Sequence, residues 1–357
     1  MSDTTANESR AVARAIDALR RGWPVAIGSG AARRLLLAVE TTDRHRLAAF
    51  DPDGSAGVLI SHQRAVTLHL ANQLPAAADA PVRIARVPWL DLDAATALAD
   101  PAHDLDTPLK GPYRTIVDGA IDEQRAAITL ARLAGLLPAF FIRDDGAAEV
   151  EITRAAVDGY EEPARLRIAA HARLPVDAAE HAEIVAFRNL DEAAEHVALL
   201  IGSPNGTPPL VRLHSECLTG DVLGSLKCDC GPQLHAALAA LAASSWGILL
   251  YLRQEGRGIG LINKLRAYAL QDQGFDTIDA NTRLGFATDA RDFAVAARML
   301  ALLGQDRVRL LTNNPEKVAG LVRAGIEVVE RVPHALPANP HNRDYLDTKR
   351  VRAGHLL

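Results

Sequence analysis

The chain has 357 residues, of which 48% are hydrophobic and 23% charged, and this composition excludes wholesale disorder. The formal net charge is −5, whereas binders of DNA, RNA and anionic lipid usually carry a basic excess. The longest apolar run, 133–142, contains a proline and is about half the ~20 residues that a membrane span needs. The N-terminal segment MSDTTANESR has no apolar stretch of the kind that signal peptides carry. We therefore expect a cytoplasmic protein of two domains that binds neither nucleic acid nor membranes.

The first half of the chain predicts a few well-defined elements. A helix over 12–21 is followed by strands over 24–27 and 34–40, with a glycine turn at 28–30 between them. Another helix is expected over 122–136. The stretch 143–180 is charged, alanine-rich and weakly periodic, so we place the boundary between domains 1–171 and 172–357 inside it.

The second half alternates strands and helices more clearly. Helices are expected from Pro232, over 261–272, from Thr288 or Asp289 to Gly304, and from Pro315 to Gly325. Strands are expected over 183–187, 196–201, 210–213, 247–252 and 307–311. This alternation predicts an α/β domain whose ligands bind at the carboxyl ends of strands.

All three cysteines lie within 14 residues of one another: Cys217, Cys228 and Cys230. An odd number in a cytoplasmic chain argues against a disulfide framework and favours metal binding. Catalytic zinc sites keep three protein ligands and leave one position for water, and three thiolates match that number. There are two alternatives: a closed structural site with His214 or His235 as the fourth ligand, or three cysteines that bind no metal.

Two segments and one arginine favour a phosphorylated ligand. The loop 253–260, RQEGRGIG, follows a strand and offers backbone amides and two arginines. The segment 312–317, TNNPEK, places a lysine at the start of another helix. Arg291 lies in the first turn of a predicted helix, where the macrodipole disfavours a cation unless an anion binds. Together with the cysteines, these features predict a polyphosphate substrate.

Several sequence blocks resemble GTP cyclohydrolase II, the enzyme that opens the imidazole ring of GTP at the start of riboflavin synthesis. The resemblance covers 172–357 and rests on RLHSECLTGDVLGSLKCDCG, RQEGRGIGL, NKLRAYALQDQG, GFATDARDF, LLTNNPEK and NRDYLDTKR followed by GHLL. It implies a mixed sheet flanked by helices, and a homodimer. The implied reaction converts GTP to 2,5-diamino-6-(5-phospho-ribosylamino)pyrimidin-4(3H)-one, formate and pyrophosphate.

The resemblance also implies roles for individual residues. The three cysteines would hold one zinc ion per subunit with water in the fourth position, and Mg²⁺ would accompany the GTP phosphates. Asp289 matches the proton acceptor, Arg291 the nucleophile toward the α-phosphate, and Tyr268 a residue needed for complete turnover. Because a guanidinium is a poor nucleophile, electrostatic stabilisation by Arg291 remains the alternative. GTP contacts are implied for Arg212, Leu213, His214, Ser215, Glu216, Gln233, Glu255, Gly256, Arg257, Thr277, Thr312 and Lys317.

Two other classes of protein compete with this interpretation. A zinc base deaminase needs H/C-x-E followed by P-C-x-x-C, and the C-x-C pair here lacks that pattern. A zinc-stabilised nucleotide- or nucleic-acid-binding module without catalysis is the non-enzyme alternative, and the acidic net charge disfavours nucleic acid.

The N-terminal half resembles 3,4-dihydroxy-2-butanone 4-phosphate synthase over 12–27, with further similarity over 36–42 and 118–129. That enzyme next needs an acidic loop of the form D-x-x-x-R-E-x-E-G-D, which binds magnesium. The corresponding stretch here, GSGAARRL over 28–35, has no carboxylate, and magnesium requires oxygen ligands. We therefore expect an α/β synthase-like domain without synthase activity.

Overall fold

The computed structural model describes residues 3–73, 76–108, 110–189, 194–287, 293–352, 354 and 356. It consists of two compact units. The first combines Met1–Glu161 with Ile259–Ala290, and the second combines Glu162–Gly258 with Arg291–Leu357. The boundary predicted between residues 171 and 172 falls inside the strand β8 (Arg167–Arg173). Among the described residues, no helix combines the length and apolar character needed to cross a membrane.

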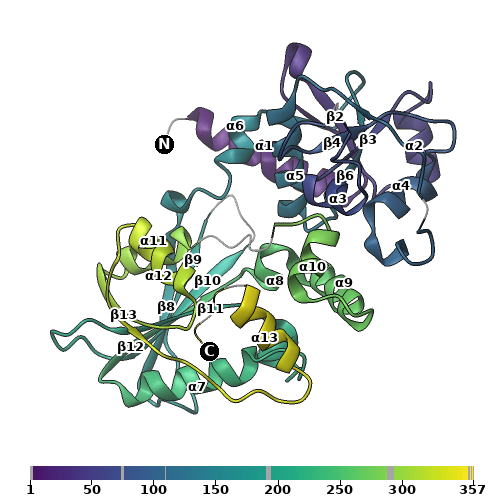
Figure 1. The fold of residues 1–357 in the computed structure, drawn as a ribbon. Coiled ribbons are helices and arrows are strands. Elements are labelled where there is room, and N and C mark those ends of the chain that lie inside the picture. The colour runs from purple at the N-terminus through teal and green to yellow at the C-terminus, as the bar shows by residue number, and fades with distance from the viewer. Residues whose placement is uncertain are drawn as a thin grey trace. The chain divides into compact units, whose positions relative to one another are not determined.

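The first unit contains a seven-stranded mixed sheet in the order β5-β4-β3-β6-β2-β1-β7, of which Figure 1 labels β2, β3, β4 and β6. β1 and β7 pair in parallel, and the other described neighbours pair antiparallel. The strands are β1 (Val25–Ile27), β2 (Arg34–Ala38), β3 (Gly57–Ile60), β4 (Val82–Ile84), β5 (Thr115–Ile116), β6 (Ala139–Arg143) and β7 (Val150–Ile152).

Alternate side chains of this sheet enter two separate hydrophobic cores. On β2, Leu35 and Leu37 enter one core while Leu36 and Ala38 enter the other, as the two-residue period of a strand requires. The second core is covered by α1 (Asp3–Arg20), α5 (Ile121–Ala134) and α6 (Arg154–Asp158). The first is covered by α2 (Arg44–Phe50), α3 (His62–Thr67), α4 (Leu92–Ala99), α9 (Gly260–Asp272) and α10 (Thr277–Arg283).

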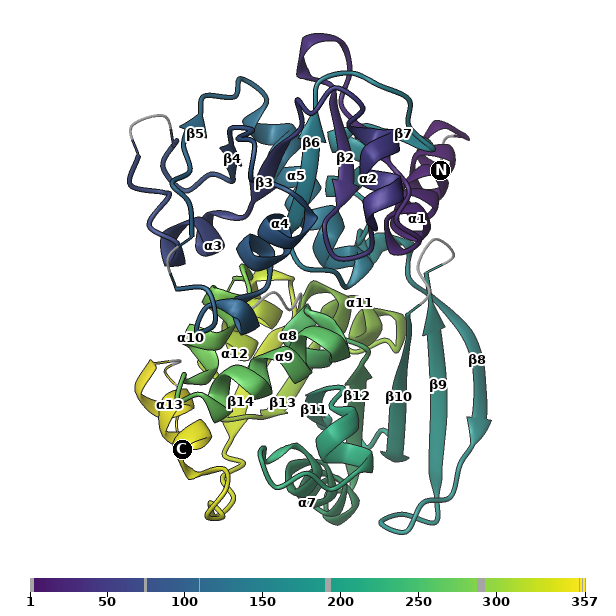
Figure 2. The same cartoon turned by 90° about the vertical axis from the view of Figure 1, so that its right-hand side faces the viewer.

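The second unit contains another seven-stranded mixed sheet, in the order β14-β13-β11-β12-β10-β9-β8. β14, β13, β11 and β12 run parallel, while β12, β10, β9 and β8 pair antiparallel. Figure 2 shows β8, β9 and β10 side by side at one end of this sheet. The remaining strands are β9 (Ala182–Arg188), β10 (Glu195–Gly202), β11 (Leu210–Ser215), β12 (Trp246–Leu252), β13 (Arg307–Leu311) and β14 (Glu327–Val332).

Helices pack on both faces of the second sheet. Ile248 and Leu250 of β12 enter a core shared with α11 (Ala294–Leu302) and α12 (Pro315–Arg323). Leu249 faces the opposite core, which is shared with α7 (Cys230–Ala243). The unit also contains the short α8 (Glu255–Gly258) and the C-terminal α13 (Arg343–Arg352). The carboxyl ends of β11, β12 and β13 lie at one sheet edge because these strands are parallel.

The predicted α/β class, with a mixed sheet flanked by helices in the C-terminal half, is confirmed, and the first unit contains a second mixed sheet. Most predicted elements are present. β13 has the predicted bounds, and Asn314 caps α12 by accepting the backbone N–H of Glu316, with Pro315 at the first helical position. α7 begins at Cys230, two residues before Pro232. The predicted start of a helix at Thr288 or Asp289 lies outside the described residues, and α11 is described from Ala294.

Candidate metal centre

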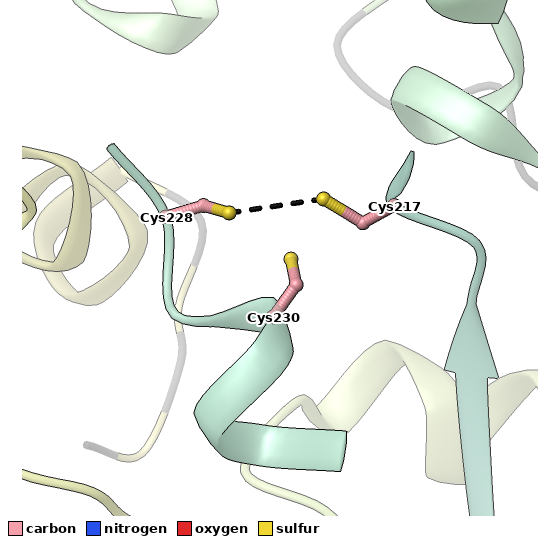
Figure 3. Close-up of side chains that lie close together, drawn as sticks. All are labelled: Cys217, Cys228 and Cys230. Carbon is pink, nitrogen blue, oxygen red and sulfur yellow. Dashed lines mark hydrogen bonds between the residues drawn. The ribbon is translucent and has the colours of Figure 1, made fainter. Parts of the chain in front are cut away.

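The three cysteines converge from three consecutive parts of the second unit. Cys217 follows β11, Cys228 lies in the loop before α7, and Cys230 is the first residue of α7. Their sulfur atoms all lie within 4.8 Å of one another, and Cys217 and Cys228 are separated by 3.7 Å. Figure 3 shows the three sulfurs turned toward a common point. This separation is far longer than a disulfide bond, and none of the three cysteines forms a disulfide.

Glycines make room for the three sulfur atoms. A Cβ added at Gly220 would lie 2.8 Å from the Cys228 sulfur and 3.0 Å from that of Cys217. A Cβ at Gly231 would lie 2.3 Å from the carbonyl oxygen of Gly220. The Gly220 N–H also donates to the Cys217 sulfur over 3.3 Å. The loop therefore closes around the cysteines only because neither glycine carries a side chain.

The chemistry of the donor set fits a divalent metal. Contact with the Cys217 sulfur, followed by burial, raises the pKa of Cys228. Contacts with the sulfurs of Cys217 and Cys228, followed by burial, raise the pKa of Cys230 well above its usual range. Three thiolates this close repel one another, and a bound cation reverses that penalty. Among the described residues the cluster contains no histidine. A three-cysteine site that a metal could occupy is thus favoured over the closed site with His214 or His235.

Asp221 links Cys217 to the sheet through hydrogen bonds. Its carboxylate accepts the Cys217 backbone N–H at 3.0 Å, the Tyr251 hydroxyl at 2.9 Å and His214 Nε2 at 3.0 Å. The rings of His214 and Tyr251 stack with centroids 5.5 Å apart. Burial, followed by the hydrogen bond to Asp221, raises the pKa of Tyr251, so the hydroxyl remains a donor. Neither Asp221 nor Tyr251 was predicted, although Asp221 stands inside the block that carries the resemblance.

The predicted residues of β11 surround this cluster. Arg212 donates to the Leu311 carbonyl at 3.1 Å and to the side chain of Gln233. Burial lowers the pKa of His214, which favours a neutral imidazole. Two buried atoms, His214 Nδ1 and Ser215 Oγ, have no hydrogen-bond partner within the described part of the chain. Buried polar atoms of this kind are satisfied in most proteins, so they mark a place where a ligand would bind. Leu213 is buried in the core beside them.

The predicted glycine-rich segment after β12 forms a tight turn beside the cysteine loop. Gly256 and Arg257 both have left-handed backbone angles, with φ of 63° and 62°. Glu255 accepts the backbone N–H of Leu218 at 2.7 Å and that of Gly256 at 3.0 Å. Glu216 accepts from Arg253 at 2.7 Å. Arg257 thus adopts a conformation that L-residues rarely occupy, which is typical of functional sites.

The predicted phosphate segment follows β13. Lys317 is buried, and its ammonium group donates to the Leu213 carbonyl at 2.7 Å. The Thr312 hydroxyl accepts the Asn314 backbone N–H at 3.0 Å. The structure therefore brings these two residues to the sheet edge where β11 ends, next to Arg212 and His214.

Two of the predicted residues that the structure describes, Tyr268 and Thr277, belong to the first unit. Tyr268 lies on α9 but outside the hydrophobic core of the first unit, to which α9 contributes Ala267 and Leu270. The Lys264 ammonium lies 5.7 Å from the centre of its ring. Thr277 opens α10 and accepts from the Gln271 side chain at 3.1 Å. Asp289 and Arg291 lie outside the described residues.

Comparison with known proteins agrees with the blocks identified in the sequence. The family model of GTP cyclohydrolase II matches residues 167–333. A GTP cyclohydrolase-2 of Azospirillum brasilense is 47% identical over 98% of this chain and 94% of its own length. A GTP cyclohydrolase-2 of Citrobacter koseri is 58% identical over 54% of this chain and 98% of its own length. The chain belongs to the GTP cyclohydrolase II family.

One solved structure is also similar along most of the chain. It is a two-domain 3,4-dihydroxy-2-butanone 4-phosphate synthase from A. baumannii, 18% identical, covering 84% of this chain and 93% of that one. The TM-score is 0.28, which is too low to assign the two chains a common fold.

Proposed function

We propose that this protein hydrolyses GTP to the diaminopyrimidine ribosyl 5′-phosphate, formate and pyrophosphate, the first step of riboflavin biosynthesis. The observation that carries the proposal is the three-thiol cluster beside β11, in which Cys217 and Cys228 are buried, in a chain of the GTP cyclohydrolase II family. Zinc held by Cys217, Cys228 and Cys230 would supply Lewis-acid activation for hydrolysis at C8 of guanine.

The chain's own residues would bind and orient the nucleotide. His214 and Ser215 offer unsatisfied buried atoms next to the cysteines, suited to hydrogen bonds with the base. The other proposed nucleotide contacts, as the family resemblance implies them, are Arg212, Leu213, Glu216, Gln233, Glu255, Gly256, Arg257 and Thr277.

The phosphates would bind where β13 ends. Lys317 and Thr312 are buried at this edge, and Mg²⁺ would accompany the phosphate oxygens. Arg291 would act at the α-phosphate, either as nucleophile or by stabilising its charge, and Asp289 would accept the proton. Tyr268 would support the second hydrolysis, which releases formate.

We further propose a cytoplasmic homodimer with one zinc per subunit that binds neither nucleic acid nor membranes. The N-terminal half would lack synthase activity. Arg33 and Arg34, within the stretch 28–35 that lacks carboxylates, form ion pairs with Glu151 and Asp118 in the first unit. Full-length protein supplied with ribulose 5-phosphate and Mg²⁺ is expected to give no four-carbon phosphate product.

The test is to incubate the full chain with GTP and Mg²⁺, recording purine absorbance and formate release with and without a zinc chelator. Loss of the purine spectrum with formate release, abolished by the chelator and restored by zinc, is the expected result. An unchanged spectrum would favour the zinc-stabilised binding module instead.

A further inference from the structure

The segment that follows β14 has no part in the proposed chemistry, yet it is bonded to the cysteine loop at several points. His334 Nε2 donates to the Gln233 carbonyl at 2.9 Å. Asn339 donates to the Leu226 carbonyl at 3.3 Å, and Asn342 to the Cys228 carbonyl at 3.5 Å. These contacts run along the loop toward α13, which Figure 1 shows in yellow. The C-terminal segment thus supports the backbone that carries two of the three cysteines.

A further contact between the C-terminal segment and the cysteine loop is a buried ion pair. The Lys349 ammonium of α13 lies 2.8 Å from Asp229 Oδ1, and the two side chains are only 11% and 7% exposed. Lys349 also lies 4.2 Å from the centre of the Tyr345 ring. Asp229 lies between Cys228 and Cys230 in the sequence, so the Lys349 ammonium binds the middle residue of the C-x-C turn. The other carboxylate oxygen of Asp229 accepts from Gln233 at 2.5 Å.

Charge explains why a cation belongs at this position. A zinc ion with three thiolates carries a net charge of −1, and the buried carboxylate of Asp229, the residue between Cys228 and Cys230, adds a second negative charge to the same turn. Lys349 offsets that excess in a place where water cannot screen it. Removing one partner of a buried pair leaves the other uncompensated, which is strongly unfavourable.

We propose that Lys349 is a positioning residue of the metal centre. Held in place by α13, its ammonium group keeps Asp229, and therefore the C-x-C turn, in position. The same charge offsets the negative charge of the zinc-loaded site. This inference rests on the proposed zinc at the three cysteines. It gives the C-terminal helix a function in metal retention.

The experiment compares zinc-loaded full-length wild type with Lys349→Met, which keeps the length of the side chain but removes its charge. Transfer of zinc to a chelating dye is expected to be about tenfold faster or more in the variant, the usual scale for residues that support metal ligands. The thiolate-to-cobalt absorption of the cobalt(II)-substituted protein is expected to change as well. Lys349→Arg restores the charge and should release zinc within about threefold of wild type.

Arg350→Met is the matched control, because Arg350 is the next residue of α13, is 59% exposed and pairs with Asp347. It should match wild type in both measurements. If Lys349→Met fails to fold, Lys349→Gln, which retains a donor for Asp229, is measured instead with the same expectation.

Equal zinc release and identical cobalt spectra for wild type and the charge-removing variant would overturn the inference. That outcome differs from failure of the proposed function, in which wild type itself would bind no zinc at the cysteines.

Discussion

Individual residues around the cysteines connect the cluster to the rest of the second unit. Asp221 accepts hydrogen bonds from Cys217, His214 and Tyr251, and therefore links Cys217 to two strands. Asp229, between Cys228 and Cys230, links these two cysteines to Lys349. Both carboxylates occur within the cysteine block of the sequence. Their importance follows from what they contact, which the one-dimensional pattern does not contain.

Replacing one cysteine tests the metal site most directly. In Cys228→Ser, the hydroxyl is a poor zinc ligand, and two remaining thiolates are too few to hold the ion. We expect bound zinc to fall from about one per chain to near zero, and GTP turnover to fall at least about 100-fold. Zinc content by mass spectrometry and formate release are the measurements.

The control is Leu223→Ala, since Leu223 lies in the same loop with 72% of its surface exposed. It should keep its zinc. A Cys228→Ser protein that still carried one zinc and released formate at the wild-type rate would contradict the assignment.

His196 of β10 provides a prediction about pH. Burial, and then the charge of Arg253, lower the pKa of His196 to about 4, and its Nδ1 accepts the Arg253 backbone N–H at 3.1 Å. The unfolded chain binds a proton near pH 6.5, while the folded protein does not do so until about pH 4. Stability should therefore fall as the pH drops through this window, by about 3 kcal/mol at most.

The measurement is the urea midpoint at pH 5.0 and pH 7.5. His196→Asn should reduce the difference between these two midpoints, because asparagine does not titrate. His171→Asn, at an exposed position of β8, should leave the difference unchanged. A wild-type midpoint that is constant across this range would refute the expectation.

At the scale of elements, the close approach of two backbone segments shapes the cysteine loop. A side chain at Gly231, in the first turn of α7, would collide with the carbonyl of Gly220. Gly231→Ala should therefore push the loop away from the helix, at a cost of about 1–3 kcal/mol in unfolding free energy. We expect weaker zinc retention, measured by competition with a chelator.

Gly119→Ala serves as the control because no atom lies within 4 Å of the added carbon. It should behave like wild type. Equal retention of zinc in the two variants would mean that the loop accommodates the extra methyl group without weakening the metal site.

Elements with strong local signals could be predicted from the sequence. β12 is a short apolar run, and β13 alternates charged and apolar residues from Arg307 to Leu310. α12 has Asn314 as its N-cap and Pro315 as its first residue, and Gly325 follows its end. The sequence does not indicate β8, because all seven of its residues are exposed and its side chains show no alternation of apolar and polar character. The start of α7 was placed too late, since Cys230 and Gly231 do not resemble a helical first turn.

The candidate site was only partly predictable for a related reason. Cysteine spacing indicated a metal, and the glycine-rich turn with Arg257 indicated a bound ligand. Asp221, Tyr251 and Lys349 make contacts with residues that are mostly far away in the sequence. Their residue types by themselves do not indicate a metal site. The parallel order of β13, β11 and β12 determines which of them meet, and this order comes from long-range pairing.

At the scale of the whole molecule, the two units are interleaved along the chain. The second half contributes Ile259–Ala290 to the first unit. Within that unit Ala267 and Leu270 of α9 and Leu284 share a core with β2, β3 and β6. A boundary chosen from sequence near residue 172 therefore separates α9 and α10 from the residues that they pack against.

This arrangement leads to the last prediction, for a fragment that contains only residues 162–357. Removal of 1–161 exposes the apolar face of α9 and α10, and each large buried side chain contributes about 1.5–3 kcal/mol of hydrophobic stabilisation. The segment also carries Tyr268 and Thr277, so its disorder should reduce GTP turnover more than it reduces zinc binding, because the cysteines belong to the other unit. Protease cleavage within 259–284, zinc content and formate release are the measurements, with the full chain as reference. A fragment that resists cleavage there and turns over GTP as fast as the full chain would show that α9 and α10 do not need this core.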